Sequence, residues 1–324
     1  MAVPARDLME FVCDPEAIPS IPVVALKIVR MSNDPTVGAK ELVSVIEKDP
    51  ALAAKTLKFA NSSYYGAAQP IRSLNQAVVR LGFRTARMLA LSFGIVEATT
   101  AKFTDFEFPV YWQRSLCTSV VARRLAQRSL PRLTEEVFVA ALLADIGCPL
   151  LAKKFPQQYR SVTKLAENGA KRLCDIERSF LQIDHAQVGA ALLSWWGLPA
   201  ELALCVGAHH DLSGLQRDNP AYPVAATVMA ASELTDLIIN PSSLGRIEHL
   251  TALFRDFYSF KPEHVSQLVE RLDSEVQEIA RLMSLPDLPG TTILAKAKEE
   301  ALRLAVTAGP AEGGAAGVQG PPLG

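Results

Sequence analysis

Cysteine is scarce in this chain of 324 residues, and the cysteines it has are scattered. Neither the paired spacing of a zinc ribbon nor the density of a disulfide framework is present. Their odd number fits small, buried side chains in a reducing compartment, so a cytoplasmic location is expected. The five are Cys13, Cys117, Cys148, Cys174 and Cys205.

An excess of one charge is lacking as well. The chain has 33 Lys and Arg residues against 34 Asp and Glu residues, which gives a formal net charge of −1. Nucleic-acid binding needs an excess of basic side chains on one face. No nucleic-acid partner is therefore expected, although a local basic patch stays open.

No pattern of a signal peptide or a membrane span is found. Residues 1–10 contain acidic side chains and no apolar run, unlike a secretory signal. A membrane helix needs roughly 18 apolar residues with few or no charges. The two most apolar stretches, 137–151 and 222–239, are interrupted by Asp145, Glu233 and Asp236. The sequence thus predicts no membrane insertion.

Strand patterns are missing too, because no segment alternates apolar and polar residues for long. Apolar residues instead recur every three or four positions, as at Val24, Ile28 and Met31. With 49% hydrophobic and 21% charged residues, the chain can bury a core and keep a polar surface. Gly and Pro punctuate the pattern at short intervals. The sequence therefore predicts an all-α fold of many helices.

The predicted helices fall into two groups. Those between residues 18 and 100 are short, and those from residue 109 onward are longer. Residues 102–108 contain three phenylalanines and are too apolar for a free linker, so the two lobes should pack together. A further helix, predicted over 291–306, either packs on the protein or binds a partner. Residues 308–324 are mostly Gly, Ala and Pro and should be disordered.

A few polar residues stand in conspicuous company. Asp145 lies inside an apolar run, His185 follows an aspartate, and His209 and His210 precede Asp211. Imidazole nitrogens and carboxylates are the ligand types of zinc, manganese and iron sites. Because they come from three separate segments, a metal site is conceivable.

Seven short segments, taken in order, resemble the HDOD family (HD-related output domain). Each segment alone is a weak signal, and the specific feature is their joint order and spacing. They are Ile18–Pro22, Leu57–Gly66, Ile71–Gly82, Ala141–Gly147, Ile183–Gly189, Trp196–Pro199 and His209–Asp211.

The resemblance implies a two-lobed helical fold related to the HD-domain metal phosphohydrolases. It divides the chain into an N-terminal extension (1–14), an HDOD domain (15–285), a C-terminal helix (286–307) and the disordered tail (308–324). Within the domain, residues 15–100 form an N-terminal helical lobe and 109–285 an HD-like lobe. The family also implies bacterial signal transduction, generally without a demonstrated enzymatic activity.

The chain departs from the HD pattern at two positions where the resemblance implies metal-binding histidines. Arg114 stands at the first, and Ala144 stands before Asp145 at the second. An arginine repels a divalent cation and cannot become a ligand. No metal and no other cofactor is therefore expected; the candidate ligands, if one is present, are Asp145, His185 and His209. We expect a degenerate pocket of Arg114, Ala144, Asp145, His185, His209 and His210.

A buried carboxylate must be paired, so the specific hypothesis is an ion pair between Arg114 and Asp145. For His185 the structural interpretation is a ring bonded to a backbone group or to Asp145. His209 and His210 are expected in the last turn of the helix that begins at Pro199. Because neighbouring helix residues point about 100° apart, at most one of these two should line the pocket.

A second candidate site lies in the N-terminal lobe. Two tyrosines could cover the core or anchor a partner. Nearby arginines could form a solvated face or bind an anion, such as a nucleotide second messenger. The residues of this candidate site are Tyr64, Tyr65, Arg72, Arg80, Arg84 and Arg87.

The favoured function is a non-catalytic signalling module that binds partner signalling proteins of unknown identity. The first alternative is a metal-dependent phosphohydrolase with residual activity on nucleotides or cyclic dinucleotides. The second is a nucleotide-binding sensor. The missing histidines at 114 and 144 favour the first interpretation over the phosphohydrolase.

Overall fold

The computed structural model describes residues 22–32, 37–62, 69–102, 108–240 and 272–285. Within these ranges the elements are helices, with no strand, which confirms the predicted all-α class. Several predictions lie outside the described residues. They concern Cys13, Tyr64, Tyr65, the N-terminal extension, the C-terminal helix and the disordered tail.

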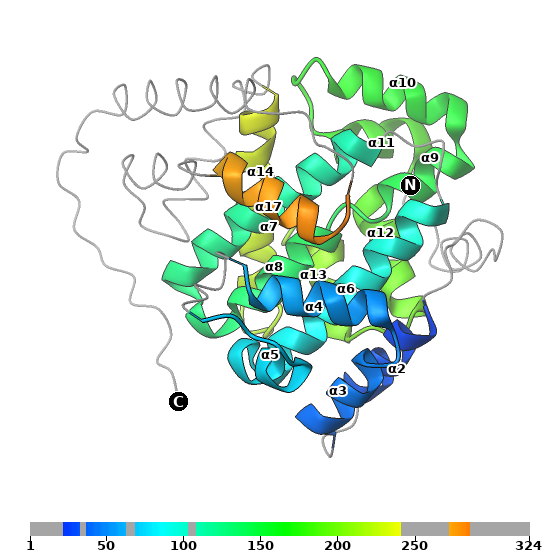
Figure 1. The fold of residues 1–324 in the computed structure, drawn as a ribbon. Helices are drawn as coiled ribbons and strands as arrows, with labels where there is room; N and C mark the ends of the chain where they lie inside the picture. Colours follow the sequence, from blue (N-terminus) through cyan, green and yellow to red (C-terminus); the bar gives the residue numbers. More distant parts are fainter. Residues whose placement is uncertain (1–21, 33–36, 63–68, 103–107, 241–271, 286–324) are drawn as a thin grey trace.

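The first group of helices precedes residue 103 and occupies the lower part of Figure 1. It comprises α2 (Val23–Ser32), α3 (Ala39–Ile46), α4 (Pro50–Ala60), α5 (Leu74–Leu81) and α6 (Phe83–Lys102).

Local sequence explains where two of these helices begin and end. Asp49 caps α4, where its carboxylate accepts hydrogen bonds from the backbone N–H groups of Ala51 and Leu52, both at 3.0 Å. Gly82 separates α5 from α6 with φ of 81°, a conformation that favours glycine. Arg80 and Arg84 therefore lie on two different helices, α5 and α6.

The second group contains α7 (Phe108–Ser129), the 3-10 turn η2 (Pro131–Leu133), α8 (Thr134–Leu143), α9 (Cys148–Lys154) and α10 (Pro156–Ala166). It continues with α11 (Leu173–Leu181), α12 (His185–Trp195), α13 (Ala200–Ala208), α14 (Tyr222–Ile239) and α17 (Leu272–Leu282).

The two groups share one hydrophobic core. Phe59 of α4 lies 5.6 Å from Phe93 of α6 and 6.5 Å from Phe138 of α8, measured between ring centroids. All three rings are almost fully buried. The lobes therefore pack together, as the sequence predicts.

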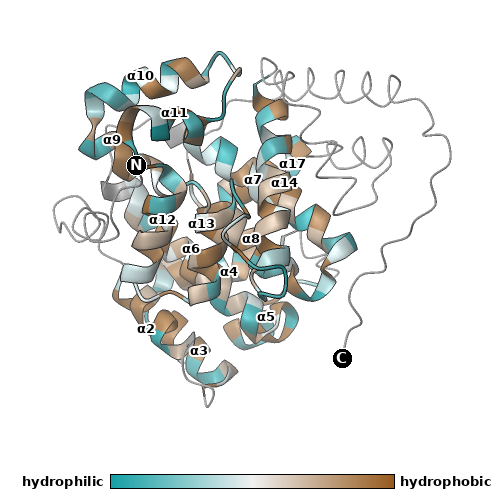
Figure 2. Ribbon diagram, turned by 180° about the vertical axis from the view of Figure 1, so that it is seen from behind, coloured by the Kyte–Doolittle hydropathy of each residue, from teal (hydrophilic) through white to brown (hydrophobic). Residues whose placement is uncertain are grey.

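Helix α8 is the central element of this core. Seven of its ten residues are apolar, and all but the two glutamates of its first turn are buried. A helix that is apolar on all sides must be covered on all sides, and α8 packs against α6, α7, α13 and α14. Figure 2 shows apolar residues gathered on these inner helices and polar residues on outer ones such as α10. The turn after α8 therefore lies deep in the protein.

Among the described helices, α14 alone has the length and composition of a membrane span. Of that 18-residue window, 72% is buried inside the protein. Burial of this extent is typical of a core helix, and α14 packs against α7, α8 and α13.

Candidate functional site

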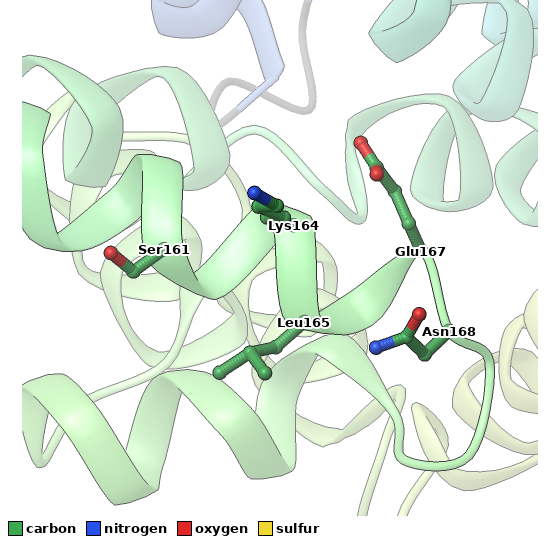
Figure 3. A pocket seen from close by; sticks show the side chains of 5 residues that line it. All are labelled: Ser161, Lys164, Leu165, Glu167 and Asn168. Atoms are coloured by element: carbon green, nitrogen blue, oxygen red, sulfur yellow. The ribbon is translucent and has the colours of Figure 1, made fainter.

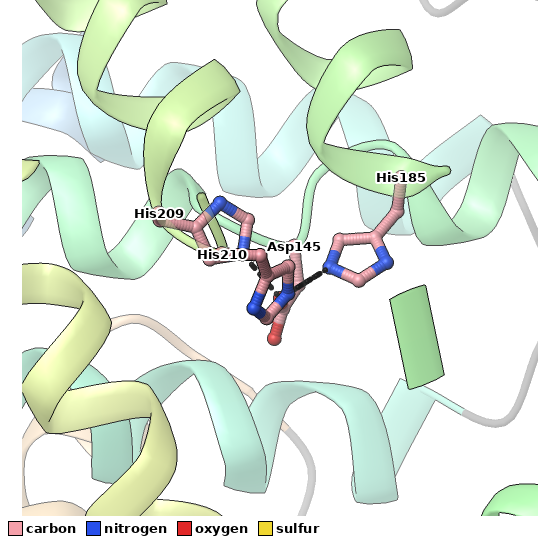
Figure 4. A group of neighbouring side chains, drawn as sticks. All are labelled: Asp145, His185, His209 and His210. Atoms are coloured by element: carbon pink, nitrogen blue, oxygen red, sulfur yellow. Dashed lines mark hydrogen bonds and ion pairs between the residues drawn. The ribbon is translucent and has the colours of Figure 1, made fainter. Parts of the chain in front are cut away.

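Five polar side chains from four segments meet at the end of α8. Asp145 lies in the turn from α8 to α9, and His185 is the first residue of α12. His209 and His210 follow the last residue of α13, and Arg114 projects from the middle of α7. The histidines and Asp145 point toward one another in Figure 4.

The predicted ion pair between Arg114 and Asp145 is present. Nε of Arg114 donates to Oδ2 of Asp145 at 2.8 Å. The same guanidinium forms an ion pair with Asp236 of α14 and donates to the hydroxyl of Ser232 at 2.9 Å. Arg114 thus joins α7, the α8–α9 turn and α14 through one cation.

His185 lies between two carboxylates. Its Nε2 is 3.2 Å from Oδ1 of Asp145, and its Nδ1 is 2.6 Å from Oε2 of Glu177. The backbone N–H of His185 also donates to Glu177 at 2.9 Å, and the Tyr159 hydroxyl donates to its other oxygen at 2.8 Å. The predicted bond of His185 to Asp145 is therefore part of a larger buried network.

His209 and His210 both enter the cluster, so the expectation that at most one lines it is wrong. Nε2 of His209 is 3.5 Å from Oδ1 of Asp145, and Nε2 of His210 is 2.9 Å from Nε2 of His185. The 100° rule assumes a continuing helix, but α13 ends at Ala208 and His209 has ψ of −5°. The chain leaves the helix there and both rings turn inward.

Burial and charge decide the protonation of these groups. Burial disfavours the charged carboxylate of Asp145, yet the Arg114 guanidinium and hydrogen bonds from His185 and His209 hold its pKa well below the usual value. Burial also opposes charge on His185, but the neighbouring Cys148 sulfur and the carboxylates of Glu177 and Asp145 raise its pKa well above the usual value. The His185 ring is therefore an imidazolium between Glu177 and Asp145.

The neighbouring ring of His210 is affected in the opposite direction. Burial, followed by the charges of His209 and His185, lowers the pKa of His210 well below its usual value. His210 is thus neutral. One of its ring nitrogens carries a proton and donates, and the other accepts.

Removing the hydroxyl of Tyr159 tests the network around His185. Tyr159→Phe is expected to lower the free energy of unfolding by about 1–3 kcal/mol, because it leaves a buried acceptor on Glu177 without its donor. Chemical denaturation followed by circular dichroism measures the change. A loss below about 0.5 kcal/mol would contradict the idea that this hydrogen bond supports Glu177.

The HDOD domain family matches residues 18–212. This chain belongs to the HDOD family. An uncharacterized protein from Treponema pallidum (strain Nichols) is 28% identical over 199 residues, which cover 60% of this chain and 38% of that protein. The match therefore spans well under half of that relative.

Solved structures share the HDOD fold. A protein named for signal transduction from Marinobacter aquaeolei VT8 has a TM-score of 0.63 at 25% identity, covering 86% of this chain and 65% of that one. An HDOD domain protein with unknown function from Geobacter sulfurreducens has a TM-score of 0.60 at 22% identity, covering 93% and 97%. The family and the first of these structures fit a role in signal transduction.

A third structure is named for phosphohydrolase chemistry and comes from Shewanella amazonensis SB2B. It has a TM-score of 0.59 at 20% identity, covering 92% of this chain and 93% of that one. At this identity the likeness concerns the fold alone.

The residues of this HDOD domain do not fit the catalytic metal that the HD relationship implies. Arg114 occupies one oxygen of Asp145, and a guanidinium cannot lose its proton to become a ligand. Ala144 is 1% exposed and offers only a methyl group. A catalytic site also needs an open position for water or substrate.

Two of the four arginines in the second candidate site are engaged within the protein. Arg84 forms an ion pair with Glu136 of α8. Arg87 stacks on Phe83, with its guanidinium carbon 5.5 Å from the ring centroid. Burial and the neighbouring charge of Arg84 lower the pKa of Arg87. Arg84 thus links α6 to α8, and Arg87 packs on its own helix.

The other two arginines, Arg72 and Arg80, are exposed. Arg80 donates to the backbone oxygen of Gln69 at 3.3 Å. In the described part of this lobe, Arg84 and Arg87 are therefore engaged by Glu136 and Phe83, while Arg72 and Arg80 are exposed.

A surface hollow on α10 is separate from the cluster. It is lined by Ser161, Lys164, Leu165, Glu167 and Asn168 (Figure 3) and includes none of the cluster residues. Its lining of one cation, one carboxylate, two neutral polar side chains and one leucine gives it no defined ligand preference.

Sequence reasoning missed Glu177, Asp236 and Ser232. Asp236 interrupts the apolar run 222–239 as Asp145 interrupts its own run, and the same signal could have found it. Glu177 lies in a helix with an ordinary polar face. Its complete burial follows from how α10 and α11 pack and has no local signal.

Proposed function

We propose that this HDOD protein is a non-catalytic output module of cytoplasmic, bacterial signal transduction, which acts by binding signalling proteins. The observation that carries the proposal is the Arg114–Asp145 ion pair. It places a permanent cation on the carboxylate that the HD relationship implies as a metal ligand.

Burial of the cluster supports the same conclusion. Asp145, His185, His209 and His210 are exposed by only 3%, 1%, 0% and 6%. Metal-dependent hydrolysis requires that substrate phosphate and a water molecule both reach the ion. Side chains this deeply buried offer a phosphodiester no route to the donor atoms.

Without a reaction, the protein transmits its signal through contacts. Its helices form one continuous core, which gives a rigid platform for docking. Rigid surfaces bind partners with little loss of conformational entropy. Unlike an enzyme, such a module needs no substrate pocket.

A direct test is hydrolysis by the full chain. We expect no turnover of bis-p-nitrophenyl phosphate, nucleotides or cyclic dinucleotides above the buffer blank, with Mn²⁺, Fe²⁺, Zn²⁺ or Mg²⁺ present. Asp145→Asn and the exposed-site variant Asp211→Asn are purified in parallel. Turnover that disappears in Asp145→Asn and persists in Asp211→Asn contradicts the proposal. Equal turnover in all three preparations identifies a contaminant.

A further inference from the structure

Charge is distributed unevenly along this chain, although its total is close to zero. Between Asp49 and Glu97 the sequence contains six basic residues and no acidic one. The rest of the chain has 27 basic and 34 acidic residues. Positive charge is thus concentrated in the segment that forms α4, α5 and most of α6. The six are Lys55, Lys58, Arg72, Arg80, Arg84 and Arg87.

Half of these cations are engaged within the protein. Lys55 and Arg84 form ion pairs with carboxylates of other helices, and Arg87 stacks on a phenylalanine ring. The other half are exposed and form no ion pair with any residue that the structure describes. These three are Lys58, Arg72 and Arg80. Their charge is therefore available to a partner.

Two of the available cations lie along one side of α5. The backbone N–H of Arg72 donates to the side chain of Gln76 at 3.1 Å, and Arg80 follows Gln76 by four residues. Residues three and four apart share one face of a helix, so Gln76, Val79 and Arg80 follow Arg72 along the same exposed face. The opposite face of α5 is buried in the core.

This face also has an apolar residue. Val79 is 82% exposed, the highest value among the exposed large apolar side chains of the described residues. A single exposed valine is common on protein surfaces. Beside Arg80 and in line with Arg72, however, it gives the face an apolar contact with a polar rim, which is the composition of a protein interface.

The face is held rigidly by Asn61 at the end of α4. The side-chain amide of Asn61 donates to the backbone oxygen of Ile71 at 2.8 Å, and its side-chain oxygen accepts from the N–H of Ile71 at 2.6 Å. Arg80 donates to the backbone oxygen of Gln69 at 3.3 Å. The segment before α5 is thus fixed against α4, so a partner meets Arg72 and Arg80 with little ordering cost.

We infer that the exposed face of α5 with Arg72, Val79 and Arg80, here called the α5 surface, is a docking surface for an acidic segment of a signalling protein. Guanidiniums bind carboxylates through paired, charge-assisted hydrogen bonds, and Val79 offers contact to an apolar side chain of the same segment. The inference rests on the proposed function and specifies the chemistry of its partner.

A protein partner fits the α5 surface better than a nucleic acid or a membrane does. Proteins that bind duplex DNA commonly contact about 6–10 phosphates, and anionic lipids are recognised by clusters of about 4–8 basic residues. The α5 surface offers two guanidiniums, and the chain outside residues 50–96 has an excess of acidic residues that repels an extended polyanion. A short acidic segment needs only this small area.

Binding to the full chain is measured by fluorescence anisotropy. The probe is a labelled peptide that repeats Glu-Leu-Asp-Ser four times, and its neutral counterpart has Gln and Asn in place of the acids. We expect the acidic peptide to bind with a Kd below about 1 mM, and the neutral one not to bind. The double variant Arg72→Glu, Arg80→Glu should weaken binding at least about tenfold, because like charges then face each other. Val79→Ser should weaken it about threefold or more.

The matched control changes the same amount of charge elsewhere. Arg160 and Lys164 are exposed cations of α10, which lies at the opposite end of the protein from α5 (Figure 1). The double variant Arg160→Glu, Lys164→Glu is expected to bind the acidic peptide as the wild type does. Equal weakening in the two double variants would show a general attraction between charges and overturn the α5 surface. Circular dichroism confirms that every variant is folded.

Labelled duplex DNA and phosphatidylserine vesicles are tested in the same buffer. If the acidic peptide does not bind, or if only the DNA or the vesicles bind and the substitutions at Arg72 and Arg80 abolish that binding, the inferred partner is wrong. Neither result changes the absence of turnover that tests the proposed function. Turnover that depends on Asp145 overturns the proposed function, whatever the α5 surface binds.

Discussion

Arg114→Ala is expected to lower the free energy of unfolding by about 3–5 kcal/mol, because breaking a buried ion pair on one side leaves an uncompensated charge. The guanidinium is 16% exposed, and Asp145 and Asp236 are 4% and 18% exposed. Both carboxylates lose their cation in the variant. Urea unfolding at neutral pH, followed by circular dichroism, measures the change.

Arg84→Ala is the matched control for this prediction. Arg84 also forms an arginine–carboxylate pair, with Glu136, but its side chain is 65% exposed. Pairs of this kind contribute about 0–1 kcal/mol, so the expected loss is below about 1 kcal/mol. If the free energy of unfolding falls equally in the two variants, burial does not determine how much the Arg114 ion pair contributes to stability.

Gly147→Ala, in the turn that carries Asp145, is also expected to lower the free energy of unfolding by a large amount. A Cβ at this position would lie 2.1 Å from the backbone oxygen of His185 and 2.9 Å from the backbone N of Gly189. Backbone atoms cannot move aside as the end of a flexible side chain can, so Gly147→Ala must displace α12 from the turn. Overpacking of this kind costs about 3 kcal/mol or more.

Gly214→Ala separates this steric effect from the general effect of replacing glycine. A Cβ at Gly214 meets nothing within 4 Å, so its stability should change by less than about 1 kcal/mol. Thermal and urea unfolding of both variants provide the comparison. If Gly147→Ala is as stable as Gly214→Ala, the close approach of α12 to the turn is not required by the fold.

The class of fold was predictable from the sequence because helical spacing and turn residues act locally. Gly82 and Asp49 mark helix ends through their own conformation and side chain, and both signals are visible in the printed sequence. The shared core was predictable in outline because the segment between the lobes is apolar. The partners of each helix depend on contacts between distant residues and were not predictable.

The candidate site was predictable only in part. The pairing of Asp145 with Arg114 follows from a general rule, because a carboxylate in an apolar run needs a cation. The inward turn of both His209 and His210 depends on where α13 ends, which periodicity does not fix to one residue. Glu177 becomes part of the site only through tertiary packing, since the residues beside it in the sequence do not indicate that it is buried.

The bond from Arg114 to both Asp145 and Asp236 also restricts how this sequence can evolve. Replacement of Arg114 by histidine removes the cation from the buried Asp145 and the partly buried Asp236 at once. A change at position 114 therefore begins from a less stable protein unless the two carboxylates change with it. The three positions are thus expected to vary together among related sequences.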